Sequence, residues 1–293
     1  MHNYLRAVGF RSIRSARASE QLMRETILHH DRKRAWQTSD GFTRCEFIKQ
    51  YAAEIGLVVC GEFDEDGNLH PQHMFPFYKG PVISMKQPIE FELHSADESY
   101  GAICDDPRIG TSIIFHLINA ADMIYAEDGR KADDPIKSRQ VRFSALAKEG
   151  SILLPIFKTH EEEAAVMAQR ERYLKLVSEA REGDEEAIEE LTEDDMNNFN
   201  ILMKRVQRED ILSIVETYFQ PSGIECDLYS ICGNVIYCEQ VRNGYTHENI
   251  WKMKVEACDV FFSLCINEKD LEGVPAPGTR FRGRVWLQGF VEF

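Results

Sequence analysis

The sequence has no long apolar run, and its first residues lack the apolar stretch of a secretory signal peptide. A helix needs ~20 mostly apolar residues to cross a bilayer, and the apolar blocks here, such as 113–117, are soon interrupted by polar residues. The start MHNYLRAVGFRSIRSARASE therefore does not resemble a secretory signal. Its arginines are typical of a transit peptide, but its apolar residues are typical of a packed element. We expect a cytoplasmic protein without a membrane-spanning helix.

Closely spaced cysteine pairs are also absent, although the chain has eight cysteines. Structural zinc sites usually contain such pairs. Cys226, Cys232 and Cys238 are too far apart for one ion, because six residues on a strand span ~20 Å, and His70 and His73 have no third ligand beside them. The sequence predicts free, mostly buried thiols in a reducing compartment, with no metal and no cofactor.

Positive charge is scarce outside the first part of the chain. The formal net charge is −15, yet residues 1–34 hold eight Lys or Arg and three acidic residues, which leaves about −20 on the remainder. This balance argues against nucleic-acid binding, because phosphate contacts supply most of that affinity. The basic segment 1–34 is a candidate contact for a protein partner, and self-association is an alternative.

Two compact units would fit in 293 residues, since single cores stop growing near ~250–300 residues. The apolar fraction of 43% and the charged fraction of 28% are those of an ordinary globular protein. We predict an α+β fold with three regions. They are a mixed N-terminal lobe at 1–157, an acidic helical hairpin connector at 158–208, and an antiparallel β unit, barrel-like (OB-like) or a sandwich, at 209–293.

Within the N-terminal lobe, short apolar runs predict strands at 4–8, 45–51, 56–63, 89–94, 99–104, 141–146 and 152–156, the last two separated at Gly150. Residues 19–30 have helical spacing. The acidic run Asp64–Asn68 lacks the glycine position of an EF-hand loop, so its Asp66–Gly67 pair predicts a tight turn rather than a calcium site. Thr111–Tyr125 is apolar nearly all round and predicts a buried helix.

The connector and the β unit have distinct patterns. Good helix formers precede Gly183, and nine acidic residues lie within 182–195. Farther on, apolar and polar residues alternate along 251–257, 260–266 and 281–291, as in half-buried strands. Gly233–Asn234 predicts a hairpin turn between two such strands.

The most chemically varied stretch runs from Cys104 to Asn119. On the predicted helix, Ser112, His116 and Asn119 would form one polar line, close to Cys104 and Asp105. A thiol near a helix N-terminus can have a lowered pKa, and a Cys/His pair suits acyl transfer. A buried histidine that only bonds its neighbours is the commoner arrangement. These five residues are a candidate pocket, and no catalytic residue is assigned.

A row of arginines precedes Trp286. On a strand, Arg280, Arg282 and Arg284 would share one face at ~6.6–6.8 Å spacing, ending on the indole ring. Such a row suits an anionic ligand, or a single-stranded nucleic acid that stacks on the indole. In an internal alternative, the acidic helix at 182–195 covers the row through ion pairs.

Four stretches of the chain resemble an uncharacterised conserved family from anaerobic Gram-positive bacteria, known as a domain of unknown function. They are GTSIIFHLINAAD, ALAKEGSILLPI, EGDEEAIEELTEDDM and CINEKDLEGVPAPGTRFRGRVWLQGFVEF. The last two are the most distinctive, and the similarity extends through essentially the whole chain. The resemblance implies a bacterial cytoplasmic protein, and it implies no activity, cofactor or site residue.

Without a catalytic constellation, the sequence favours a non-enzymatic binding or regulatory protein. Its ligand would be an anionic small molecule at the arginine row, or a protein partner. The alternative is a small-molecule hydrolase or transferase with a Cys/His site around Cys104 and His116. A third hypothesis is a scaffold whose partner contacts the basic segment 1–34.

Overall fold

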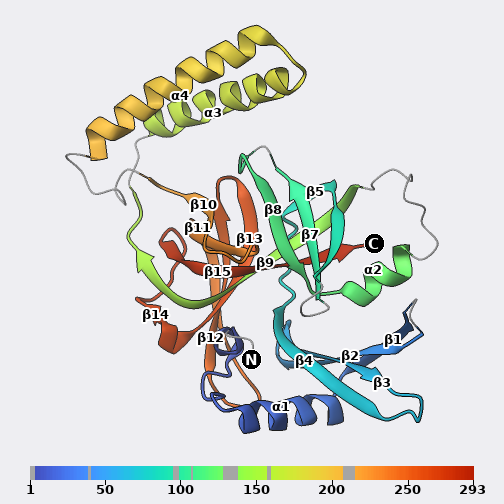
Figure 1. Ribbon diagram of the computed structural model, residues 1–293. Coiled ribbons are helices and arrows are strands. Elements are labelled where there is room, and N and C mark those ends of the chain that lie inside the picture. The colour runs from blue at the N-terminus through green and yellow to red at the C-terminus, as the bar shows by residue number, and fades with distance from the viewer. Residues whose placement is uncertain are drawn as a thin grey trace.

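The computed structural model describes residues 4–38, 41–94, 99–106, 108–127, 138–156, 160–206 and 215–293. These residues form two β-sheets with helices around them, which confirms the predicted mixed α+β class. Figure 1 shows the layers: α1 lies beneath a small sheet, the large sheet lies above that sheet, and a helical hairpin projects from the opposite end. The predicted region boundaries at 157/158 and 208/209 lie outside the described residues.

The small sheet, here called the N-terminal sheet, is an antiparallel meander in the order β1-β2-β3-β4. With the helices before it, this part comprises η1 (Leu5–Val8), α1 (Ala16–Leu28), β1 (Arg32–Gln37), β2 (Thr43–Ala52), β3 (Ile55–Phe63) and β4 (Leu69–Tyr78). Ser15 is the N-cap of α1, because its side-chain oxygen accepts a hydrogen bond from the Ala18 amide. The helix and the strands predicted for 19–63 are confirmed.

Two local predictions in this part have different outcomes. The tight turn at Asp66–Gly67 is confirmed: it joins β3 to β4, and Gly67 has a φ of 81°. The strand predicted at 4–8 is wrong, because this segment forms the 3-10 helix η1, which ends at Gly9 with a φ of 85°. A left-handed residue at this place suits glycine and turns the chain toward α1.

Within the described residues the large sheet has eleven strands, and its main path runs in the order β10-β11-β12-β13-β9-β15-β8-β7-β6. Before the hairpin come β5 (Met85–Pro88), β6 (Glu90–His94), β7 (Ser99–Asp105), β8 (Ser112–Leu117), α2 (Ala120–Glu127) and β9 (Ser138–Leu153). After it come β10 (Tyr218–Pro221), β11 (Leu228–Arg242), β12 (Asn249–Ala257), β13 (Val260–Asn267), η2 (Glu268–Asp270), β14 (Leu271–Glu272) and β15 (Arg280–Glu292).

Strands from the first and last regions of the chain share this one sheet. β9 pairs in parallel with β13 and antiparallel with β15, so it lies between two strands of the predicted C-terminal unit. β15 also pairs with β8 and with β11. The two strands predicted around Gly150 are instead the single strand β9, in which the missing Gly150 side chain leaves room for the Phe281 ring.

Two further predictions in the large sheet are wrong. Residues 111–125 form the strand β8 followed by the short helix α2, because an apolar run with β-branched Ile113 and Ile114 suits a strand that is covered on both faces. Gly233 and Asn234 lie inside β11 and do not form a turn. A side chain on Gly233 would meet Val255 and the Glu256 carbonyl, so the glycine serves close packing.

The helical hairpin consists of α3 (His160–Arg181) and α4 (Glu185–Val206), as predicted for the acidic connector. Gly183, with a φ of 92°, lies between the two helices, and Arg172 of α3 forms ion pairs with Glu190 and Asp194 of α4. None of the helices in the described part of the chain is long and apolar enough to span a membrane.

Hydrophobic residues form one cluster on each face of the large sheet. Along β15, Val285 and Leu287 belong to the first cluster, whereas Trp286 belongs to the second, which contains η1, α1 and the N-terminal sheet. The alternation predicted for 281–291 therefore corresponds to burial on both faces. The second cluster holds the N-terminal sheet against the large sheet, and the candidate site lies at this junction.

Candidate functional site

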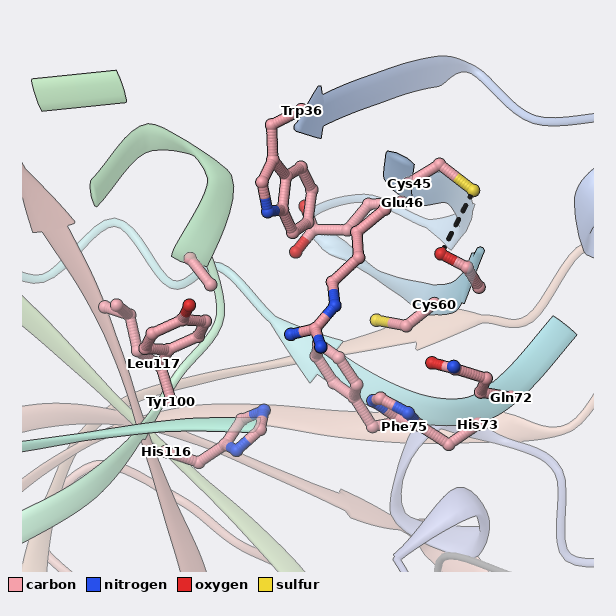
Figure 2. Close-up of a pocket in the computed structure, with 13 residues that line it drawn as sticks. Trp36, Cys45, Glu46, Cys60, Gln72, His73, Phe75, Tyr100, His116 and Leu117 are labelled. Carbon is pink, nitrogen blue, oxygen red and sulfur yellow. Dashed lines mark hydrogen bonds between the residues drawn. The ribbon is translucent and has the colours of Figure 1, made fainter. Parts of the chain in front are cut away.

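A pocket opens between the N-terminal sheet and the β7–β8 edge of the large sheet (Figure 2). Its enclosed volume is about 30 Å³, which is room for about one or two water-sized groups. Its wall combines aromatic rings with polar side chains. The lining residues are Trp36, Arg44, Cys45, Glu46, Cys60, Gly61, Gln72, His73, Phe75, Tyr100, His116, Leu117 and Ala120.

Strand register places the polar wall of the pocket. Trp36 lies opposite Arg44 in the β1–β2 pairing, and Arg34 lies opposite Glu46. Because side chains alternate along a strand, these four residues project from one face of the N-terminal sheet. Cys60 of β3 lies opposite both Glu46 and His73, which extends the same face across the sheet.

The facing wall comes from the large sheet and contains His116 of β8. His116 is 8% exposed, and its ring packs edge-on against Phe75, with centroids 4.6 Å apart. The same ring lies against Trp286, with centroids 4.9 Å apart. Tyr100 of β7 and the start of α2 complete this wall. The aromatic contacts hold His116 at the junction of the two sheets.

Glu46 is the most unusual group in the pocket. Its side chain is only 3% exposed, and within the described residues no hydrogen bond or ion pair reaches its carboxylate. Burial raises its pKa to about 7; the charge of Arg34 opposes this rise, and the charge of Asp122 adds to it. Arg34 itself forms an ion pair with Asp122 of α2. A buried carboxyl group that titrates near neutral pH is a common feature of functional sites.

Figure 2 shows how the labelled side chains meet. The carboxylate of Glu46 lies beside the Trp36 ring, and the rings of Phe75, His73 and His116 lie on the other side of the space. Ligand pockets typically have such a wall, mostly aromatic with a few polar groups. The site can therefore hold a small polar group against a flat hydrophobic surface.

The predicted grouping around Cys104 is not formed. In the β7–β8 pairing Cys104 lies opposite Ile113, whereas His116 lies opposite Gly101, so the two side chains project from opposite faces of the sheet. Cys104 is buried beside Met85, and burial, together with Asp106 and Asp105, raises the pKa of its thiol to about 12. A thiol in this state is not a nucleophile at neutral pH.

The other residues of this predicted pocket make local contacts. Ser112 donates a hydrogen bond of 2.6 Å to the Asp105 carboxylate at the exposed end of the β7–β8 pair. Asn119 follows β8, donates to the Val291 carbonyl at 2.9 Å, and accepts from the Val291 amide at 3.1 Å. Of the five predicted residues, only His116 lines the pocket between the sheets.

The arginine row lies on a strand, as predicted, but its two ends are buried. Arg282, Arg284 and Trp286 lie opposite alternate residues of β11, which confirms that they share one face. Trp286 is 3% exposed: it packs against Tyr4, and its indole nitrogen donates to Asp227 at 2.6 Å. Arg282 and Arg284 are exposed, and no ion pair reaches them among the residues that the structure describes.

Arg280, the first arginine of the row, connects the two ends of the helical hairpin. It is 4% exposed and donates hydrogen bonds to the Leu154 carbonyl at 3.0 Å and to the Val215 carbonyl at 3.2 Å. Leu154 precedes α3, and Val215 follows α4. Arg280 thus joins the two chain segments from which the hairpin projects.

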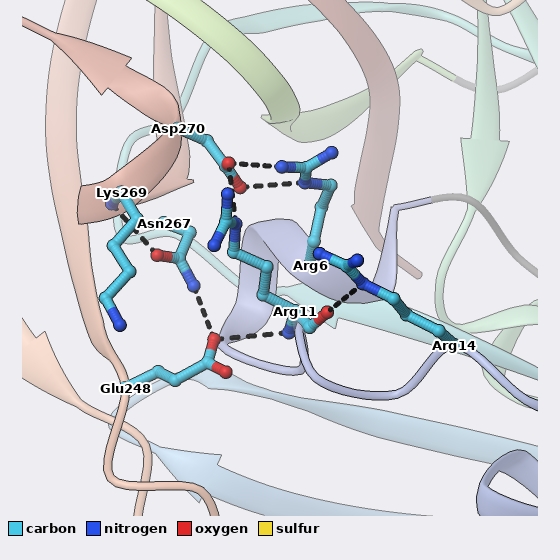
Figure 3. A network of polar contacts seen from close by, with 7 residues as sticks. All are labelled: Arg6, Arg11, Arg14, Glu248, Asn267, Lys269 and Asp270. Atoms are coloured by element: carbon cyan, nitrogen blue, oxygen red, sulfur yellow. Dashed lines mark hydrogen bonds and ion pairs between the residues drawn. The ribbon is translucent and has the colours of Figure 1, made fainter.

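The basic N-terminal segment is partly used inside the molecule (Figure 3). Arg6 and Arg11 both donate to the Asp270 carboxylate, Arg11 at 3.0 Å through its side chain. The Arg11 amide donates to Glu248 at 3.1 Å, and Asn267 donates to the same carboxylate. These contacts attach the N-terminal segment to η2, so Arg6 and Arg11 already have partners.

Sequence reasoning missed most of the pocket, because Trp36, Arg44, Glu46, His73 and Tyr100 come from four different strands. One signal was present: Glu46 interrupts the apolar residues Cys45, Phe47 and Ile48 within a predicted strand. A charged residue at a buried strand position indicates either a paired charge or a functional group.

Comparison with known proteins gives one match. A family model described as "Domain of unknown function, E. rectale Gene description (DUF3881)" matches residues 5–289, nearly the whole chain. No curated protein matches, and no solved structure matches. The match confirms the family resemblance that the four sequence stretches indicated.

Proposed function

The chain belongs to the DUF3881 family, and we propose that it is a non-enzymatic protein that binds a small molecule in the pocket between its two sheets. The observation that carries this proposal is the Glu46 carboxyl group, which is buried in the pocket wall and has no hydrogen-bond partner among the described residues. Burying such a group costs free energy unless something else compensates. A ligand that meets Glu46 would supply the compensation.

The composition of the wall supports binding. Trp36, Phe75 and Tyr100 provide flat apolar area, and Arg44 and Glu46 provide polar groups two residues apart on one strand face. A small number of polar groups on a mostly aromatic wall orient a ligand and make its binding specific. The enzymatic alternative around Cys104 and His116 has less support, because these side chains project from opposite faces of the sheet.

A ligand screen with matched variants tests the proposal. The melting temperature of the purified chain would be measured with small carboxylates, amines, nucleotides and phosphorylated metabolites. Cys60→Leu places a larger side chain in the pocket, and Cys238→Leu makes the same change on β11, away from it. We expect a ligand that raises the melting temperature of the wild type and of Cys238→Leu but not of Cys60→Leu. An equal rise in all three proteins would exclude the pocket.

A second candidate surface is the pair Arg282 and Arg284. Both are exposed on β15 and face the same side of the strand. An anionic ligand or a protein partner with an acidic surface would suit them. Arg282→Glu would weaken binding at this surface and would leave binding in the pocket unchanged. A ligand titration of this variant therefore shows which of the two sites the ligand occupies.

We also infer a barrel-like arrangement for the C-terminal strands. β11 pairs with β12 through its later residues and with β15 through its earlier ones. These pairings support the predicted barrel-like unit, with β9 contributed from the earlier part of the chain.

A further inference from the structure

We propose that the surface around Arg282 and Arg284 binds the helix α4 of a second copy of this chain. The inference rests on the second candidate surface proposed above and names its partner, and it does not involve the pocket. It is supported by the exposed groups of the two surfaces, by their spacing and by the reach of the helical hairpin.

The first surface consists of two exposed arginines and an apolar turn. Arg282 and Arg284 share one face of β15, and no ion pair reaches either of them in the part of the chain that the structure describes. The turn between β10 and β11 adjoins this row, because Leu228, which follows the turn, lies opposite Trp286. Ile224 in this turn is fully exposed. The surface therefore offers two guanidinium groups beside one apolar side chain.

The second surface is the side of α4 that faces away from α3. Ala187 is buried, and Glu190 and Asp194 form ion pairs with Arg172 of α3, so these residues mark the inner side of the helix. Helical periodicity places another set of residues on the opposite side. All of them are exposed: Glu185, Ile188, Glu189, Thr192, Glu193 and Met196. Large apolar side chains among carboxylates on an exposed helix face are typical of a surface that docks on a partner.

The charged groups of the two surfaces have matching spacing. Arg282 and Arg284 are alternate residues of a strand, ~6.6–6.8 Å apart. Glu189 and Glu193 are four residues apart on a helix, which separates them by ~6 Å along the axis. Each guanidinium can therefore meet one carboxylate at the same time, and such pairs are among the strongest hydrogen-bonded pairs in proteins. The apolar side chains that flank the carboxylates on α4 would then pack against Ile224.

The reach of the hairpin assigns the contact to a second copy. Arg280 holds the two segments from which the hairpin projects. Glu189 lies ~25 Å along the helix from Val206, the end of α4, whereas Arg284 lies only ~13 Å along β15 from Arg280. Laid along its own strand, α4 would carry its carboxylates past the arginines. In Figure 1 the hairpin instead projects away from the large sheet, where another molecule can meet it.

Local pairing, not net charge, must hold the two copies together. The net charge of −15 makes them repel each other, although salt screens charges farther apart than about 8 Å. Two acidic residues also lie near the arginines: Glu225 is in the same turn as Ile224, and Glu272 lies opposite Ser151, which is the partner of Arg282 on β9. Neither forms an ion pair with the arginines among the described residues. Arg282 and Arg284 therefore keep their donors for another molecule.

The strength of the association follows from its symmetry. Each copy offers an α4 and accepts the α4 of its partner, so a two-fold dimer contains the contact twice. Exposed ion pairs are individually weak. We therefore expect a dissociation constant on the order of 10–100 μM, with a monomeric chain in dilute solution.

Sedimentation velocity of the full chain, at concentrations below and above this value, tests the proposal. The sedimentation coefficient of the wild type should rise with concentration. The double variants Arg282→Glu/Arg284→Glu and Glu189→Arg/Glu193→Arg should each associate at least about tenfold more weakly, because like charges then face each other. A mixture of the two variants should associate about as well as the wild type, since both contacts of the mixed dimer are complementary again. This restoration also shows that both variants are folded.

A matched control moves the same charge change to the basic N-terminal segment. Arg14→Glu/Arg17→Glu alters two exposed arginines there and should associate like the wild type. Loss of association in this control, or unchanged association in Arg282→Glu/Arg284→Glu, would assign the contact to another surface and overturn the proposal. A mixture of the two charge-reversed variants that does not associate would overturn it as well.

A wild type that stays monomeric at every concentration also overturns the assignment of the partner. Calorimetric titration with hexaglutamate then separates the partner from the surface. Binding that disappears in Arg282→Glu/Arg284→Glu would leave the arginine surface intact as a site for an acidic protein. Absence of binding would remove that surface too, and ligand binding in the pocket would be unaffected by either result.

Discussion

The ring of His116 lies against the indole of Trp286, with ring centroids 4.9 Å apart and planes inclined by 42°. The two residues belong to separate candidate sites in the sequence, yet they meet at the junction of the two sheets. Tyr4 also packs against Trp286, and Phe75 also packs against His116. A column of four aromatic rings thus connects the N-cap residue of η1 with β15, β8 and β4.

Trp286→Ala should destabilise the protein by about 3–5 kcal/mol, because it removes a large side chain that is almost completely buried. It also leaves Asp227 without the indole donor. Urea unfolding followed by circular dichroism measures the change. Arg282→Ala on the same strand face is the control, with an expected effect within about 0.5 kcal/mol. Similar losses in both variants would contradict the role of the aromatic column.

Glu46→Gln should change how stability depends on pH. The pKa of Glu46 rises from an ordinary value of 4.5 to about 7 in the folded state, so the folded chain binds more protons than the unfolded chain between these values. Stability is therefore lost as pH rises from about 4.5 to 7, by up to about 3 kcal/mol. The variant should lack this loss and be more stable than the wild type at mildly alkaline pH.

Unfolding free energies measured in urea across this range test the prediction for Glu46. Glu272→Gln, an exposed glutamate on β14, is the matched control and should follow the wild type. A variant at position 46 that loses stability with pH as steeply as the wild type would show that another group is responsible.

Arg280→Ala should loosen the attachment of the helical hairpin. The change leaves the Leu154 and Val215 carbonyls without their guanidinium donor, and loss of such hydrogen bonds from a buried charge costs about 2–4 kcal/mol. We expect faster limited proteolysis and faster hydrogen exchange near these two residues. Arg284→Ala, which removes an exposed arginine of the same row, should leave both rates unchanged.

Asp259→Gly should stabilise the protein by about 0.5–1 kcal/mol. Cys258 and Asp259 form the two-residue turn between β12 and β13, and both have positive φ, 52° and 61°. Such a turn favours glycine, and the backbone carbonyl of residue 259 can still accept from Arg108. Gly278→Ala, at a φ of 88° with open space around it, should have the opposite effect. Thermal unfolding of both variants measures the two changes in stability.

Periodicity along the chain predicted most strands and the helical hairpin, because alternation and helix-forming composition are local properties. The strands at 249–267 and 280–292 follow directly from residues that alternate in polarity. Residues 112–117 were predicted wrongly, because a mostly apolar run fits a buried helix and a doubly covered strand equally well. Only the neighbouring strands β7 and β15 decide between them.

The pocket depends on packing that no short stretch encodes. Glu46 and His116 are brought into one wall by the contact of two sheets, whereas Cys104 and His116, close in sequence, are separated by the alternation of β7 and β8. Alternation along the strand predicted that the arginines share one face. It did not predict that Arg280 is buried, because the burial depends on contacts with the segments that flank the hairpin. Sequence proximity was therefore a poor guide to the site.

The position of β15 has a consequence for synthesis on the ribosome. This strand pairs with β8, β9 and β11, all of which are translated before it. Until residues 280–292 leave the exit tunnel, those three partners present open edges and uncovered apolar side chains, which are prone to aggregate. A nascent chain stalled before residue 280 should therefore be a strong client for chaperones, and it should lose this dependence once the last strand is released.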